Sequence, residues 1–196
     1  MTDRPRTEED LRRLRSYQDD RGRMRIDEAN QRCHSFTNTD LQNESARWLA
    51  LAVKASYPPA VFLDANLSLA NSFIAKDKAG QEAARQQAIH ASMSKDPNIL
   101  FGMANFVTTG SSASMGPDLR VSAWRLLGCQ SGFDCSAGSN VVKSICGNDP
   151  QCANNETMIE YLQRTTGAKF GEIQLQASQI KAALDAQDAE AIEKFL

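Results

Sequence analysis

Residues 46–75 read ARWLALAVKASYPPAVFLDANLSLANSFIA, and this stretch decides the fold class. The residue before a proline is pushed out of the helical region of the backbone, whereas a proline ring suits the first turn of a helix. Tyr57-Pro58-Pro59 therefore predicts the end of one helix and the start of the next. Apolar residues recur at helical spacing on both sides of it, and the expected inner faces are Leu41, Trp48, Leu49, Ala52 and Val53, then Val61, Phe62, Ala65, Leu69, Phe73 and Ile74. A connector this short predicts an antiparallel αα-hairpin.

The same spacing continues along the rest of the chain. Thr39 or Asp40 suits the cap of the first hairpin helix, and Asp96-Pro97 suits the start of another. Further helices are expected over 79–94, 97–107, 119–129, 140–146, 156–164, 169–186 and 189–196. No window shows the strict two-residue alternation of a strand. The sequence predicts an all-α protein, a compact bundle of about eight to ten helices built from antiparallel αα-hairpins.

The chain divides into a charged N-terminal region and one helical domain. Residues 1–36 carry a thin apolar stripe of Leu11, Leu14 and Tyr17 on a charged surface, which predicts a peripheral, solvated helix. Residues 37–196 are expected to form a single domain. Within it we expect repeat-like hairpins over 37–107, a loop over 108–118 (TTGSSASMGPD), and a Cys-rich helical part over 119–196.

Charge and hydropathy narrow the classes of partner. The 196 residues include 22 basic and 24 acidic side chains, a formal net charge of −2. Such a balance gives no electrostatic drive towards nucleic acid or an anionic membrane. The longest dense apolar stretch, Trp48–Val53, is far shorter than the roughly 18–20 residues that span a bilayer. We therefore expect no nucleic-acid partner and no membrane-spanning segment.

Residues 46–60 resemble the first half of a Sel-like repeat, one of the tetratricopeptide-like helical families. Such repeats show a small residue, Trp-Leu, an Ala three positions on, a turn with proline, and an Ala in the second helix. Here these positions are Ala46, Trp48, Leu49, Ala52, Pro58, Pro59 and Ala60. The resemblance is best over 46–75, although the family's glycine signature is absent there. Weaker matches to the same pattern occur at 123–127 and 183–192. It implies a scaffold that binds other proteins.

Five cysteines lie at positions 33, 129, 135, 146 and 152. Cys129–Cys135 and Cys146–Cys152 share a spacing, and QSGFD and GNDPQ between them contain residues that favour turns. The four cysteines allow three connectivities, and the turn residues favour the two local bridges. A tetrahedral zinc site is the rival interpretation, but zinc ligand pairs usually stand two to four residues apart. Free buried cysteines are the third alternative. No cofactor or metal is expected.

Disulfides imply an oxidising compartment. The sequence therefore predicts a bacterial periplasmic or envelope protein, with a signal or lipoprotein leader absent from the sequence given; a cytoplasmic location is the alternative. Cys33 is then the odd thiol, and a small buried hydrophobe is its expected role.

Candidates for acid–base chemistry are few. Cys33 and His34 are adjacent and would point about 100° apart on a helix, so they do not form a catalytic pair. His90 is expected to be a partly exposed helix residue. Glu156 and Glu160 share a face of the expected helix 156–164 at four-residue spacing, for which a solvated face is the simpler interpretation.

Three functions stay open at this point. The leading prediction is a non-enzymatic protein–protein interaction module of the bacterial envelope, such as an immunity protein or inhibitor that binds a toxic effector. The alternative is an envelope-acting enzyme, such as a helical peptidoglycan hydrolase with Glu156 or Glu160 as its acid. The third is a small-ligand binder with an aromatic groove, whose walls would be Trp48, Phe62, Phe73 and Trp124.

Overall fold

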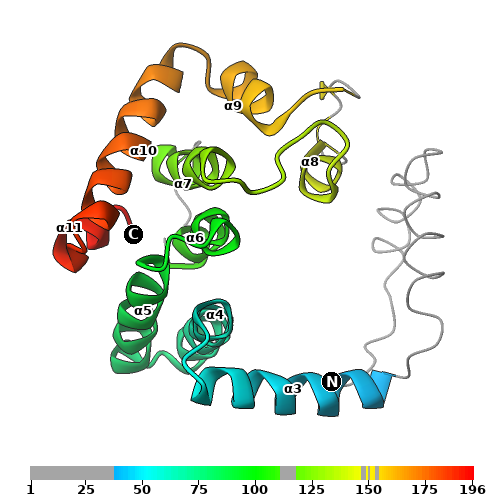
Figure 1. Cartoon of the computed structure of the whole chain (residues 1–196), viewed down its shortest axis with the longest axis vertical. Helices are drawn as coiled ribbons and strands as arrows, with labels where there is room; N and C mark the ends of the chain where they lie inside the picture. Colours follow the sequence, from blue (N-terminus) through cyan, green and yellow to red (C-terminus); the bar gives the residue numbers. More distant parts are fainter. Residues whose placement is uncertain (1–37, 111–117, 147–148, 150, 153–154) are drawn as a thin grey trace.

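The structure is a computed structural model that describes residues 38–110, 118–146, 149, 151–152 and 155–196 (Figure 1). Helices are the only regular secondary structure in these residues. The predicted all-α class is confirmed. The predicted N-terminal helix and Cys33 lie outside the described residues.

The helices follow one another along the chain in the order of their labels. In the first half they are α3 (Asn38–Lys54), α4 (Pro58–Ala75), α5 (Lys78–Ser92) and α6 (Pro97–Gly110). In the second half they are α7 (Leu119–Gln130), α8 (Asn140–Cys146), α9 (Met158–Thr166), the 3-10 turn η1 (Gly167–Lys169), α10 (Phe170–Asp185) and α11 (Ala189–Glu193).

Prolines and left-handed residues set several helix ends. Tyr57 has an extended backbone and Pro58 is the first residue of α4, as the Tyr-Pro-Pro motif predicts. Asp96 Oδ1 accepts the backbone N–H of Asn98 at 2.8 Å, which caps the start of α6. At the far end of α4, Lys76 adopts a left-handed conformation with φ 57°, and its N–H bonds to Phe73 O. This arrangement satisfies carbonyls that the end of a helix would leave free.

Several predicted helix boundaries differ from those observed, among them the start of α3 and the end of α6. Helix α3 begins at Asn38, before the expected caps Thr39 and Asp40. Helix α6 runs three residues into the predicted loop and ends at Gly110. The hydroxyls of Thr108 and Thr109 donate to the carbonyls of Ala104 and Asn105 four residues earlier, so both hydroxyls find partners within the last turns of the helix.

The core lies between the middle and C-terminal helices. Helix α4 packs on α5, α6 on α7, and α7 on α10, while α11 returns beside α5 (Figure 1). The largest fully buried side chains are Trp124, Phe106, Leu69, Ile89, Ile99, Leu100, Met103, Leu126, Met158, Leu162, Ile173 and Ile180. Lys95 and Asp185, 90 residues apart, form an ion pair at 2.7 Å that joins the end of α5 to the end of α10.

The predicted inner faces of α3 and α4 are wrong at three positions. Trp48 is 63% exposed and Ile74 83% exposed, and Phe73 is exposed as well. Leu49, Ala52 and Val53 are partly buried, as predicted. Helix α3 packs mainly on α4, at the edge of the core. The outward side of α4 is also apolar, so the spacing of its hydrophobic residues does not distinguish core from surface.

Candidate functional site

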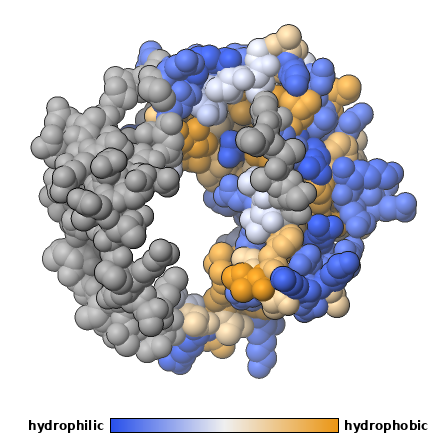
Figure 2. All heavy atoms as spheres, turned by 180° about the vertical axis from the view of Figure 1, so that it is seen from behind, coloured by the Kyte–Doolittle hydropathy of each residue, from blue (hydrophilic) through white to orange (hydrophobic). Residues whose placement is uncertain are grey.

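The first candidate site is an apolar surface on α3 and α4. Seven of the nine large hydrophobic side chains exposed in the described residues lie between positions 48 and 74. They are Trp48, Leu51, Tyr57, Leu63, Leu67, Phe73 and Ile74, which we call the α3–α4 apolar surface. Figure 2 shows hydrophobic side chains gathered over α4 on the face seen from behind. A concentration of this kind is typical of an interaction site rather than of scattered surface residues.

Helix geometry explains why this surface is continuous along α4. Leu63, Leu67 and Ile74 are separated by four and seven residues, which places them in one row along the helix. The opposite row, with Phe62, Ala65 and Leu69, is buried in the core. Helix α4 thus has two apolar faces and uses one of them for folding.

The aromatic residues expected to line a groove do not come together. Trp124 is fully buried, and its Nε1 donates to Phe195 O at 3.1 Å. Phe62 is buried, with its ring centroid 6.3 Å from that of Phe106. Trp48 and Phe73 are exposed. Two of the four side chains are therefore core and two belong to the α3–α4 apolar surface, so the four do not line one open groove.

The second candidate site surrounds a disulfide. The structure pairs Cys129 with Cys135, with Cα atoms 5.5 Å apart, and Cys146 with Cys152, with Cα atoms 5.2 Å apart. These are the two local bridges that the turn residues favour. Cys146 is the last residue of α8 and partly buried, while Cys152 is buried.

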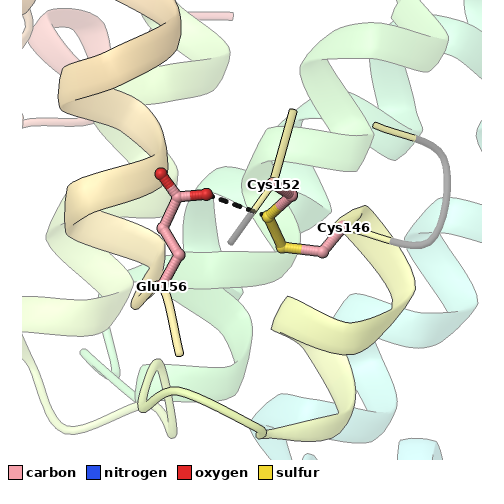
Figure 3. A group of neighbouring side chains, drawn as sticks. All are labelled: Cys146, Cys152 and Glu156. Carbon is pink, nitrogen blue, oxygen red and sulfur yellow. Dashed lines mark hydrogen bonds between the residues drawn. A yellow bond between two sulfur atoms is a disulfide. The ribbon is translucent and has the colours of Figure 1, made fainter. Parts of the chain in front are cut away.

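A buried carboxylate lies against the second disulfide. Oε2 of Glu156 is 2.9 Å from Sγ of Cys152 (Figure 3). Glu156 is only 8% exposed, and Arg164 forms an ion pair with it, with Nε 2.8 Å from Oε1 and Nη2 3.1 Å from Oε2. A buried charge needs such a partner, because burial alone would strongly disfavour it. This two-point contact also fixes the orientation of the carboxylate.

Arg164 connects this carboxylate to a second one. Its Nη2 also donates to Oδ2 of Asp149 at 2.9 Å, and the two carboxylates raise the pKa of Arg164. The pKa of Asp149 is lowered, first by the backbone N–H of Gln151 and then by Arg164. The face of the Tyr161 ring lies 5.3 Å from the guanidinium carbon. The site is a Cys–Cys–Glu–Arg cluster whose acidic group is held in one place.

The predicted pairing of Glu156 and Glu160 on one helical face is wrong. Helix α9 begins at Met158 with Thr157 as its cap, so Glu156 lies outside the helix. Thr157 Oγ1 accepts the N–H of Glu160, while Glu160 Oε2 accepts the N–H of Thr157 at 2.8 Å. This capping box lowers the pKa of Glu160, chiefly through the backbone N–H of Thr157. Reciprocal capping fixes the helix start two residues later than predicted.

The sulfur–carboxylate contact is not evident from the sequence. Cys152 and Glu156 stand four residues apart, but they lie in irregular chain and no helical periodicity relates them. Arg164 follows eight residues after Glu156. The spacing of Cys146 and Cys152 is the one feature of the sequence that indicates this site. The contact with Glu156 is recognised only in the structure.

One group in the described residues has the donor atoms of a metal site. The sulfurs of Cys146 and Cys152 and a carboxylate oxygen of Glu156 all lie within 4.8 Å of one another. Soft metals bind thiolates, and here the two sulfurs are bonded to each other. In the disulfide form this cluster therefore offers one ionised ligand, the carboxylate, which Arg164 already holds.

His90 lies at an open cavity of about 380 Å³. Ser56, Val61, Met93, Ser94 and Gln187 also line it. No acidic side chain is among its lining residues. His90 therefore lacks the carboxylate that would orient it for acid–base catalysis at this cavity.

Within the described residues, no helix is both long and apolar enough to cross a membrane. Comparison of the chain with protein-family models, curated proteins and solved structures found no match.

Proposed function

We propose that this protein is a non-enzymatic binding module that recognises another protein through the α3–α4 apolar surface. The observation that carries the proposal is the exposed row of Leu63, Leu67 and Ile74 on α4, together with exposed Trp48 and Leu51 on α3. Binding sites between proteins commonly place aromatic and aliphatic anchors at their centre. The Sel-like resemblance of residues 46–75 covers the same two helices, and we propose that they correspond to the two helices of such a repeat.

The charges around this surface favour an apolar partner segment. Glu44, Arg47, Lys54, Asp64 and Lys76 lie on α3, on α4 and at its end, and their charges nearly cancel. A surface for nucleic acid or anionic lipid would carry an excess of Lys and Arg. The proposed occupant is therefore the apolar face of an amphipathic helix in another protein.

The two disulfides support an oxidising compartment such as the bacterial periplasm. In that setting the binding role takes the form of an immunity protein or inhibitor that neutralises a toxic effector. Peptide mapping of protein from its native host tests the compartment. Both pairs should be resistant to alkylation before reduction, and free thiols at all four positions would contradict it.

The envelope hydrolase is the weaker alternative. Glu156 is bound by Arg164, and Glu160 closes the capping box of α9. Each carboxylate is held by a structural partner, which does not suit the proton donor of a hydrolase.

Site-specific photo-crosslinking tests the binding surface. A benzophenone amino acid at Leu67, in the native host, should give a discrete adduct with a second protein. The same probe at Leu175, which is exposed on α10, is the matched control and should give none.

The purified partner then decides the function. Leu63→Asp with Leu67→Asp should weaken its binding at least tenfold, while Leu175→Asp should leave binding unchanged. Loss of the partner's own activity on binding would support an inhibitor. Adducts containing only a second copy of this chain, or vesicle binding without a protein adduct, would overturn the proposal.

A further inference from the structure

The two disulfides close loops of equal length but have different surroundings. Each joins cysteines six positions apart. Within the described part of the chain, no carboxylate or imidazole ligand atom lies within 4.8 Å of both sulfurs of Cys129–Cys135. At Cys146–Cys152 the carboxylate of Glu156 does. The chain therefore contains its own control for the effect of a carboxylate on a disulfide.

The contact between Cys152 and Glu156 suits a thiol better than a disulfide. A disulfide sulfur has no hydrogen to donate to the oxygen 2.9 Å away. If Cys152 were reduced, its S–H could donate to the same oxygen, and the negative charge would favour the protonated thiol over the thiolate. The carboxylate thus stabilises the dithiol relative to the disulfide.

The two sulfurs also differ in their exposure to an attacking thiolate. Cys152 is buried and lies against a negative charge, which repels a thiolate. Cys146 is partly buried at the end of α8. Exchange rates depend on access and on which sulfur is attacked. Cys146 is therefore the more exposed residue of the pair and the expected point of attack.

We propose that Cys146 and Cys152 form a thiol–disulfide exchange site for small thiols such as glutathione, in which Glu156 is the base for Cys152. In the opening step a glutathione thiolate attacks Cys146 Sγ. The Cys146–Cys152 bond breaks, a mixed disulfide forms at Cys146, and the sulfur of Cys152 takes a proton from Oε2 of Glu156, which has drawn it from water. Attack by a second glutathione thiolate on the glutathione sulfur of the mixed disulfide releases oxidised glutathione and leaves both cysteines reduced.

The closing step uses the carboxylate. Cys152 transfers its proton to Oε2 of Glu156 as its sulfur attacks Cys146 Sγ in the mixed disulfide. The Cys146–glutathione bond breaks, glutathione leaves as a thiolate, and Glu156 returns the proton to solvent. Arg164 is a positioning residue that keeps the carboxylate against Cys152.

Redox titration of the full chain in glutathione buffers provides the first test. Samples are quenched with acid and alkylated, and each cysteine peptide is quantified by mass spectrometry. Cys146–Cys152 should become half reduced at a value of [GSH]²/[GSSG] that is at least tenfold lower than the value Cys129–Cys135 requires. Equal midpoints, or the reverse order, would overturn the proposal.

Trapping identifies the attacked sulfur. With oxidised glutathione, Cys152→Ser should accumulate a mixed disulfide at Cys146, and Cys146→Ser should form at least tenfold less at Cys152. Equal labelling of both variants would contradict the assignment. These two variants leave Glu156 and Arg164 in place.

Closing kinetics test the base. Removal of a general base typically slows a step by about 10²–10⁴-fold, so Glu156→Gln should slow closure of the mixed disulfide at least tenfold and make its rate rise more steeply with pH. Glu172→Gln, at an exposed acidic residue of α10, is the matched control. An unchanged closing rate in a folded Glu156→Gln variant would exclude the base. If circular dichroism shows that Glu156→Gln does not fold, Glu156→Asp replaces it in the test. Glu156→Asp should retain part of the closing rate, and a closing rate equal to that of the wild type would exclude Glu156 as the base.

Discussion

Gly128 of α7 lies directly against the backbone of Phe101 in α6. A Cβ added to Gly128 would stand 2.7 Å from both the backbone nitrogen and the Cα of Phe101. Two helices approach this closely only where one of them lacks a side chain. The same region holds Phe133, whose ring stacks on that of Phe101 with centroids 4.2 Å apart. Gly128 therefore sets how closely α6 and α7 pack.

Gly128→Ala should destabilise the protein by about 1–3 kcal/mol, because the backbone of Phe101 would have to move. The matched control is Gly171→Ala in α10, where an added Cβ meets nothing within 4 Å. That change should stabilise the helix by about 0.5–1 kcal/mol. Urea unfolding followed by circular dichroism measures both. Similar effects at the two glycines would contradict the close approach of α6 and α7.

Trp124→Phe should lower the free energy of unfolding by about 2 kcal/mol. The change removes the hydrogen bond to Phe195 O and leaves space in the core. Trp48→Phe, at an exposed tryptophan, should change stability by less than about 0.5 kcal/mol. Because the chain has two tryptophans, each variant also isolates the fluorescence of the other. Red-shifted emission from Trp124 in the Trp48→Phe variant would show that Trp124 is not buried.

Stability should fall in acid as the ion pairs of Asp185 are lost. Hydrogen bonds from Lys181 and then Lys95 lower the pKa of Asp185 from 3.8 to about 2. A carboxyl whose pKa is lower in the folded state stabilises the protein above its unfolded pKa. This contribution is therefore complete above about pH 4 and is lost as the pH falls to about 2.

Urea midpoints of the wild type and Asp185→Asn, measured between pH 1.5 and 7, test this. The difference between the two should be constant above pH 5 and should disappear near pH 2. It should also shrink in 0.5 M salt, since Lys95 and Asp185 are about half exposed and Lys181 is more exposed still. A difference that persists at pH 1.5 would point to packing rather than charge.

Thr157→Ala should cost about 1 kcal/mol, because it removes the cap of α9. Glu160→Gln should cost less, since glutamine also accepts the N–H of Thr157 in a capping box. Thermal unfolding of the two variants measures the difference. A large loss of stability in Glu160→Gln would mean that its charge, rather than the hydrogen bond, holds the helix start.

Several features follow from local sequence. Tyr57-Pro58-Pro59 and Asp96-Pro97 set helix starts because proline restricts the backbone locally. The cysteine loops contain the residues that let each loop close on itself. The start of α9 depends on a reciprocal contact between Thr157 and Glu160, and the residue types alone allow the helix to begin earlier.

By itself, the sequence determined that the described part of the chain is helical and, within a few residues, where most of its helices begin and end; among three cysteine connectivities it favoured the two local bridges. These properties depend on residues within a few positions of one another. Only the tertiary structure decided that one apolar face of α4 is buried and the other exposed, and that Arg164 holds Glu156 against Cys152. Spacing along a helix shows which residues share a face, but it does not show which face meets another part of the chain.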